Sequence, residues 1–244
     1  MTPLLLSGAT CVVTFMGGII ALRMQTYRGL LFAFCAGALV AVALMDIIPD
    51  ALQILEATQS DFQPRHLLVF CSLGFVVFYL FEHAAHHESA HDHPAHYNHT
   101  CQVGAWGAAG ISAHSFFDGV AIGGAFLVGG EVAWSVTSAV LLHKLADGVS
   151  TVGVMLGTQH SVRATVLMLT ATALAPLLGT LSQLLFSLPQ AVLALTLGWF
   201  AGVFLYLGAS SLLPAAHETY HSRWLPVVTL AGGVFVYLAH LLAE

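Results

Sequence analysis

The sequence predicts an all-α membrane protein with eight transmembrane helices, and its composition is the first observation behind that prediction. Hydrophobic residues make up 58% of the 244 residues and charged residues only 7%, whereas a soluble domain is about 25% charged. Because a chain of this size cannot bury so much apolar surface in one soluble core, the remainder must face lipid. The net charge of -6 gives no reason to expect a nucleic-acid partner.

The second observation is that apolar runs of membrane-spanning length recur along the whole chain. A spanning helix needs about 20 residues, and helices satisfy their backbone groups internally, as lipid requires. We place helices at 3–22, 28–48, 66–82, 103–128, 132–157, 163–186, 190–213 and 224–242. No basic segment precedes the first run, so we expect a retained helix rather than a signal peptide, and a single transmembrane domain over 1–244.

The six lysines and arginines predict the orientation of the chain. The connections after the first, fifth and seventh helices lie on one side and hold Arg23, Arg28, Arg163 and Arg223, whereas the opposite side holds Arg65. Because positively charged loops stay in the cytosol, both termini are expected outside the cell membrane.

A histidine-rich segment over 83–100 is expected to be a cytosolic loop between the third and fourth helices. It contains His83, His86, His87, His91, His93, His96 and His99, and no lysine or arginine. One interpretation is a weak metal-collecting tract, and the other is a solvated linker. Both predict a disordered segment.

The third observation is a repeated motif, His-x-x-x-Asp-Gly-Val, at 114–120 and again at 143–149. Residues four apart share one helix face and are separated by about 6 Å along the axis. Two facing helices therefore present His114, Asp118, His143 and Asp147 as four ligands for one divalent cation. Imidazole suits zinc, iron, nickel and copper, and carboxylates extend the range toward manganese.

Ionisable residues in the middle of a membrane helix are functional candidates, because each costs about 2.5–3.5 kcal/mol by insertion scales. The alternative is that these polar side chains only join helices by hydrogen bonds. Two identical pairs on neighbouring helices favour the metal site. Lys144 is also within a span, and Asp118 or Asp147 is its natural partner. Gly119 and Gly148 fit close packing or local unwinding around the site.

A weaker repeat makes the sequence of the second helix similar to that of the seventh. The segment Asp46–Ala51 is echoed by Ser211–Ala216, and these helices run in opposite directions. The echo predicts an inverted repeat of helices 1–3 and 6–8 around helices 4–5, as in many transporters. Asp46 is either a guide for cations entering the pathway or an ordinary acid at the end of a span.

At these residues the sequence resembles the ZIP (Zrt- and Irt-like) family of divalent metal transporters. Its fourth-helix and fifth-helix motifs match His114–Gly119 and His143–Gly148, and its proline turns match Pro49 and Pro214 in part. The resemblance implies a transport site at His114, Asp118, His143 and Asp147, with metal uptake into the cytosol. It also implies elevator-type alternating access, in which helices 1, 4, 5 and 6 move against helices 2, 3, 7 and 8.

The sequence departs from the two-metal members of that family. They use an asparagine, an acid and a glutamate where this chain has Ser115, Lys144 and Ala175. We therefore expect the second metal site to be lost, and the positive charge of Lys144 to stand in for the second metal ion. The motif prolines are replaced by Phe117 and Ala146, which removes the reason to expect kinks there.

We therefore expect transport of zinc, with iron, manganese and cadmium as alternative substrates. The ion is the substrate, no cofactor is required, and the partners are the lipid bilayer and, in one oligomeric form, a second copy of the chain. The alternative is an intramembrane zinc-dependent hydrolase, which would use the same ligands to activate water. It is disfavoured because four protein ligands leave no open position. The inverted repeat likewise disfavours a metal sensor.

Overall fold

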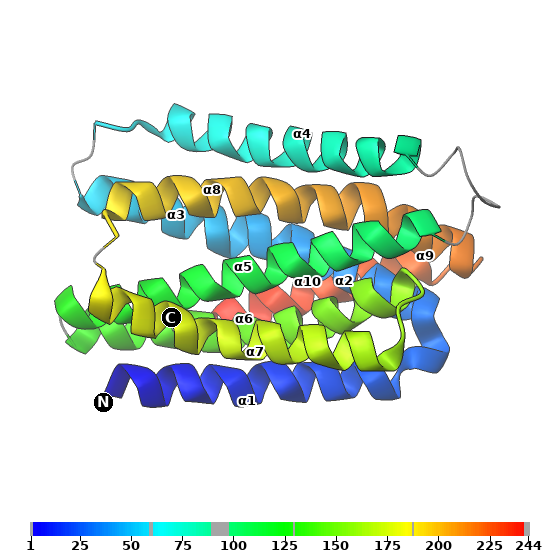
Figure 1. The fold of residues 1–244 in the computed structure, drawn as a ribbon, viewed down its shortest axis with the longest axis horizontal. Coiled ribbons are helices and arrows are strands. Elements are labelled where there is room, and N and C mark those ends of the chain that lie inside the picture. The colour runs from blue at the N-terminus through cyan, green and yellow to red at the C-terminus, as the bar shows by residue number, and fades with distance from the viewer. Residues whose placement is uncertain (1, 59–60, 89–97, 129, 187, 242–244) are drawn as a thin grey trace.

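The computed structural model describes residues 2–58, 61–88, 98–128, 130–186 and 188–241, and every regular element in these ranges is helical. The helices form an elongated bundle (Figure 1). They are α1 (Thr2–Arg23), α2 (Arg28–Ala41), α3 (Ile48–Ala57), α4 (Pro64–Glu88), α5 (Asn98–Val128), α6 (Gly130–Gly157), α7 (Val162–Leu185), α8 (Gln190–Tyr206), α9 (Leu213–Thr219) and α10 (Leu225–Leu241), with a short 3-10 turn η1 (Gln25–Tyr27).

The predicted fold class, an all-α multi-pass membrane protein, is confirmed. Each predicted span coincides with one helical segment, counting α2–α3 and α8–α9 as one segment each. Six helices in the described ranges are long and apolar enough to cross a membrane, and α10 is a shorter apolar helix. The largest departures from the predicted boundaries occur at two prolines and in the histidine-rich segment.

The predicted helices 28–48 and 190–213 are too short, because each continues past a proline. A six-residue π-helical segment precedes each proline, η2 (Val42–Ile47) in one and η4 (Leu207–Leu212) in the other. Pro49 and Pro214 then occupy the first turn of α3 and of α9, where a missing backbone N–H is tolerated. The two echoed segments thus share one local structure, while the complete inverted repeat stays a prediction.

The expected loop over 83–100 is also partly wrong, because helix extends into it from both sides. α4 runs on to Glu88 and α5 begins at Asn98, so four of the seven histidines lie in helices. Alanine and glutamate, which favour helix, continue α4 after its apolar run ends. His91, His93 and His96, and the disorder expected for them, lie outside the described residues.

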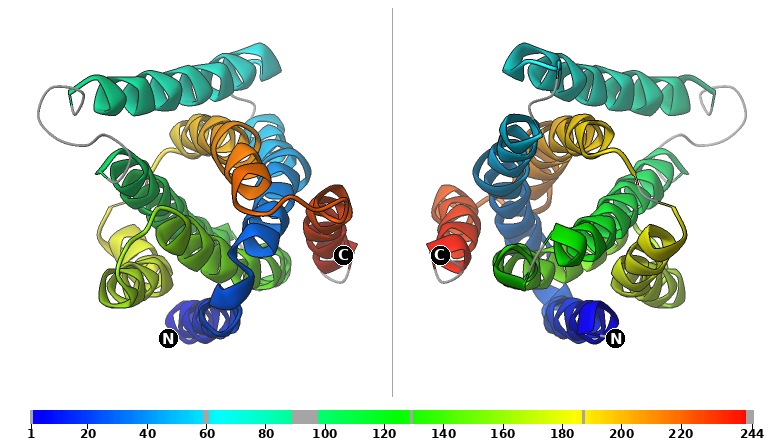
Figure 2. Two further views of the ribbon diagram at one scale, coloured as in Figure 1. Left: turned by 90° about the vertical axis from the view of Figure 1, so that its right-hand side faces the viewer. Right: turned by 90° about the vertical axis from the view of Figure 1, so that its left-hand side faces the viewer.

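The helices divide into two groups, which the end-on views of Figure 2 show side by side. We call α1, α5, α6 and α7 the first group, and α2–α3, α4, α8–α9 and α10 the second group. Hydrogen bonds tie each group together. In the first group, Ser7 Oγ lies 2.5 Å from Thr180 Oγ1 and Ser112 Oγ lies 2.6 Å from Thr172 Oγ1. In the second, Ser211 Oγ donates to Glu82 Oε2 at 3.1 Å.

The boundary between the two groups has weaker and more apolar contacts. Cys35 Sγ of α2 faces the carbonyl oxygen of Val149 on α6 at 3.7 Å, and the ring of Phe117 on α5 packs against that of Phe200 on α8, with centroids 5.6 Å apart. A thiol is a weak donor, and apolar contacts are not directional. These two contacts are therefore weaker and less directional than the hydrogen bonds within each group.

The two motif glycines allow other helices to approach the central pair closely. A Cβ atom on Gly148 would collide with the carbonyl oxygen of Thr14 on α1, and one on Gly119 would collide with that of Pro176 on α7. Each glycine therefore lets the backbone of an outer helix rest directly against α6 or α5. Of the two sequence interpretations, the structure favours close packing.

We expect Gly148→Ala to destabilise the protein, because the added methyl group meets backbone rather than a movable side chain. Overpacking of this kind costs about 1–3 kcal/mol. The measurement is thermal unfolding in detergent micelles, with Gly8→Ala on α1 as the matched control, since nothing lies within 4 Å of a Cβ atom there. Equal unfolding midpoints for the two variants would contradict the close contact.

Candidate metal site

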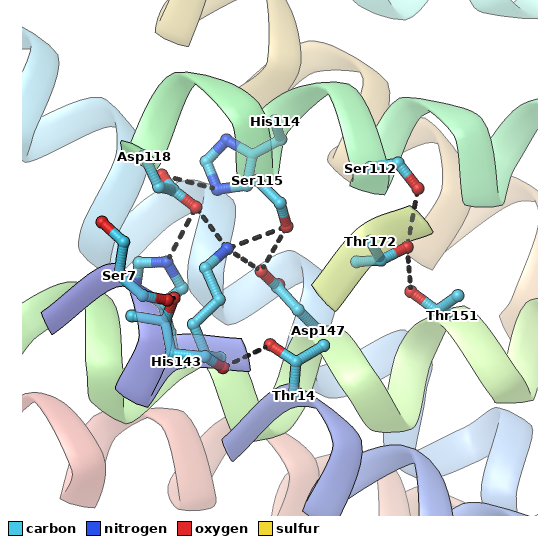
Figure 3. A network of polar contacts seen from close by, with 12 residues as sticks. Ser7, Thr14, Ser112, His114, Ser115, Asp118, His143, Asp147, Thr151 and Thr172 are labelled. Carbon is cyan, nitrogen blue, oxygen red and sulfur yellow. Dashed lines mark hydrogen bonds and ion pairs between the residues drawn. The ribbon is translucent and has the colours of Figure 1, made fainter. Parts of the chain in front are cut away.

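The four predicted ligands come together in the middle of α5 and α6. His114, Asp118, His143 and Asp147 are 1%, 4%, 6% and 1% exposed, and one ligand atom from each lies within 4.8 Å of all the others. Figure 3 shows the two imidazoles and two carboxylates facing one another between the helices. The spacing of four residues within each motif places its histidine and aspartate on the same helix face.

Asp118 is the central residue of this cluster. Its Oδ1 lies 3.4 Å from His114 Nε2, and its Oδ2 lies 3.4 Å from His143 Nε2. Metal–ligand bonds of about 2.0–2.2 Å place the donor atoms of a tetrahedral zinc site about 3.3–3.6 Å apart. The cluster therefore needs a contraction of about an ångström at its widest point to bind one ion.

Several buried ligand atoms lack a hydrogen-bond partner. They are both ring nitrogens of His114, Nδ1 of His143 and Oδ1 of Asp147. Buried polar atoms without a partner are rare and call for an explanation. A divalent cation would use the lone pairs of such imidazole and carboxylate atoms, so the donor set fits a zinc-like ion.

Lys144 lies inside the same cluster and is completely buried, with 0% of its side chain exposed. Its Nζ donates to Asp118 Oδ2, to Asp147 Oδ2 at 2.6 Å and to Ser115 Oγ at 2.9 Å. An ammonium has three donors, and all three are used here. The sequence left open which aspartate pairs with Lys144, and in the structure both do.

The second group of helices contributes an apolar wall to the site. The ring of His114 packs edge-on against Phe204 of α8, with centroids 4.9 Å apart, and lies 6.0 Å from the ring of Phe200. Phe204 has 0% exposure. Because such a wall lowers the local dielectric constant, it strengthens the electrostatic interactions within the cluster.

The remaining candidate residues differ in how they stand to the four predicted ligands. Asp46 on η2 is buried, and its Oδ1 lies 3.1 Å from Nδ1 of His240 on α10. The sequence analysis did not predict that Asp46 pairs with His240. A single histidine in an otherwise apolar helix was the feature of the sequence that could have indicated such a pair. Ala175 is buried on α7 and offers no ligand atom, whereas Ser115 joins the cluster through Lys144 and, at 3.3 Å, through Asp147 Oδ2.

The fold and the site define a multi-pass membrane protein with a buried cluster of two histidines and two aspartates between two helices. A family model described as the ZIP zinc transporter matches residues 101–240, which is more than half of the chain and includes all four ligands. The chain belongs to this family. Membership confirms the resemblance noted in the sequence, and agrees with the expectation that the protein is not an enzyme.

Two characterised relatives match parts of the chain. Zinc transporter zipt-7.1 of Caenorhabditis briggsae is 30% identical over 135 residues, which are 53% of this chain and 33% of the relative. IAA-alanine resistance protein 1 of Arabidopsis thaliana is 32% identical over 101 residues, which are 41% of this chain and 22% of the relative. The chain thus matches no more than a third of the length of either relative.

Proposed function

We propose that this protein transports a divalent transition metal, zinc in the first place, through the ligands His114, Asp118, His143 and Asp147. The observation that carries the proposal is the buried set of two imidazoles and two carboxylates, several of whose nitrogen and oxygen atoms have no hydrogen-bond partner. Iron, manganese and cadmium are the alternative substrates, because carboxylates widen the range of ions that imidazole accepts.

The proposed direction of transport is into the cytosol, with both termini outside the cell membrane and the histidine-rich segment inside. Four of the five arginines support this orientation by the positive-inside rule. In that orientation α5 runs outward and α6 inward, so Asp118 and His143 form the outer layer of the site and His114 and Asp147 the inner layer. The pair of Asp46, on η2 within the α2–α3 segment, and His240, in the last turn of α10, is proposed as an entrance for cations.

The division into two groups of helices supports the proposal of alternating access. The four ligands belong to the first group, and the wall against His114 belongs to the second. If the first group slides along the second, the bound ion moves with α5 and α6. The ion then loses access to the solution on one side of the membrane and gains access to the solution on the other side. The hydrogen bonds within each group and the apolar boundary between the groups support such an elevator-type movement.

The decisive experiment places purified protein in liposomes that contain a zinc-sensitive dye and follows the zinc influx. We expect influx that depends on the protein, without hydrolysis of peptides or lipids. Zinc-dependent hydrolysis in the absence of any influx would instead support the intramembrane hydrolase, and would overturn the proposed function.

The histidines between the third and fourth spans are expected to be dispensable for transport itself. Serine replaces all seven in this variant: His83, His86, His87, His91, His93, His96 and His99. Of the described ones, three lie at the end of α4, which holds none of the four proposed ligands, and His99 lies in the first turn of α5, well before His114. We expect a largely unchanged maximal rate of zinc influx in liposomes. Complete loss of influx in a well-folded variant would place these histidines in the pathway.

A further inference from the structure

We propose that Lys144 is a tethered cation that occupies the metal site when no metal is bound, and that it competes with the transported ion for Asp118 and Asp147. The inference rests on the proposed function and deepens it, since it assigns one residue the role of setting how tightly the ion is held. It starts from the position of the Lys144 ammonium between the two ligand carboxylates.

The competition follows from the atoms that Lys144 uses. Its Nζ donates to Oδ2 of Asp118 and Oδ2 of Asp147, one oxygen of each carboxylate ligand. Oδ2 of Asp118 is also the atom that faces His143 Nε2. A cation placed among the four ligands is therefore close to the ammonium, and like charges repel strongly in a buried site. Binding of the ion must weaken at least one of the two ion pairs.

The structure also provides a place for the ammonium once the ion is bound. Ser115 Oγ accepts from Nζ at 2.9 Å and is not one of the four ligands. Oδ1 of Asp147 has no hydrogen-bond partner, so the ion can use this oxygen while Nζ moves toward Ser115. Because Lys144 has no exposure to solvent and is covalently attached, its charge stays next to the site throughout.

The formal charges show what this arrangement favours. Two ionised aspartates and one lysine give the empty site a charge of -1, and one divalent ion changes it to +1. Without the lysine the values would be -2 and 0. Lys144 therefore stabilises the empty site and destabilises the loaded one, which favours release of the ion. A second divalent ion would raise the charge to +3, so the site is expected to hold one ion.

The test is zinc titration of detergent-purified protein in which serine replaces the seven histidines of the 83–99 segment. We expect one ion per chain, and Lys144→Met should bind it about 5- to 150-fold more tightly, the range typical of coupling between two ligands. In liposomes the same variant should reach half-maximal influx at a lower zinc concentration with a lower maximal rate, because release is slower.

Stability provides a second readout that does not depend on transport. Without metal, Lys144→Met removes the ammonium that pairs with both buried carboxylates, so its unfolding midpoint should fall. Zinc should raise that midpoint more than it raises the midpoint of the unaltered protein. If the methionine variant does not fold without metal, recovery of the folded protein on adding zinc supports the proposal equally. Lys144→Gln, whose amide can still donate to a carboxylate, allows the titration in that case.

Ser112→Ala is the matched control, because it removes a half-buried hydroxyl from α5 that contacts Thr172 rather than the cluster. Its zinc affinity should be unchanged. One ion per chain with equal or weaker affinity in Lys144→Met would overturn the competition while leaving the transport site intact, and two ions per chain in the unaltered protein would also overturn it. Absence of zinc binding by the unaltered protein would count against the proposed function itself.

Discussion

Replacing Asp147 with asparagine is expected to abolish zinc influx in liposomes while leaving the protein folded. Asparagine keeps the shape of the side chain but removes the charge that faces Lys144 and completes the ligand set. Loss of a residue that merely supports a metal ligand already costs about 10–100-fold in affinity or activity, so loss of a ligand should cost at least as much. His143→Ala is expected to have an effect of the same size.

The measurement is the initial rate of influx, normalised to the amount of correctly inserted protein. Asp61→Asn is the matched control, since Asp61 is an exposed acid between α3 and α4, and its rate should equal that of the unaltered protein. Influx at the unaltered rate in a folded Asp147→Asn or His143→Ala protein would remove these residues from the transport mechanism.

A disulfide between the two groups of helices is expected to stop transport reversibly. A Cβ atom on Gly153 of α6 would lie 3.8 Å from Cβ of Cys35 on α2, which is the mean separation in disulfides. Gly153→Cys, in a protein whose other cysteines are replaced by serine, should therefore cross-link to Cys35 on oxidation. Because the bond joins the two groups that slide past each other in the proposed mechanism, influx should fall to background and return on reduction.

Two controls separate blocked movement from general damage. With Cys35→Ser in addition, the Gly153→Cys protein has no partner thiol, so oxidation should not change its influx. The pair Ser112→Cys and Thr172→Cys replaces two hydroxyls that are 2.6 Å apart within the first group, and a bond there should leave influx intact. If the protein keeps its full influx when Cys35 is completely cross-linked to the cysteine introduced at position 153, movement at this boundary is refuted.

The sequence by itself was enough to predict the fold class, the approximate positions of the spans and the four residues that cluster between α5 and α6. These features depend on local rules: apolar length is matched to bilayer thickness, and a spacing of four residues places two side chains on one helix face. The two identical His-Asp pairs could therefore be recognised without knowing how the helices pack. The predicted ends of two spans were wrong at Pro49 and Pro214, because a proline is a local sign that a helix ends. In the structure both helices continue beyond the proline after a π-helical segment.

Only the tertiary structure decided which side chains meet across different helices. It showed that Lys144 binds both aspartates at once, that Asp46 pairs with His240, and that the helices divide into two groups. It also assigned Gly119 and Gly148 to close helix contacts. Such contacts depend on the rotation and crossing of each helix, which the packing of the entire bundle sets. The pattern along any one helix, repeating every 3.6 residues, shows which residues share a face but not which neighbouring helix that face meets.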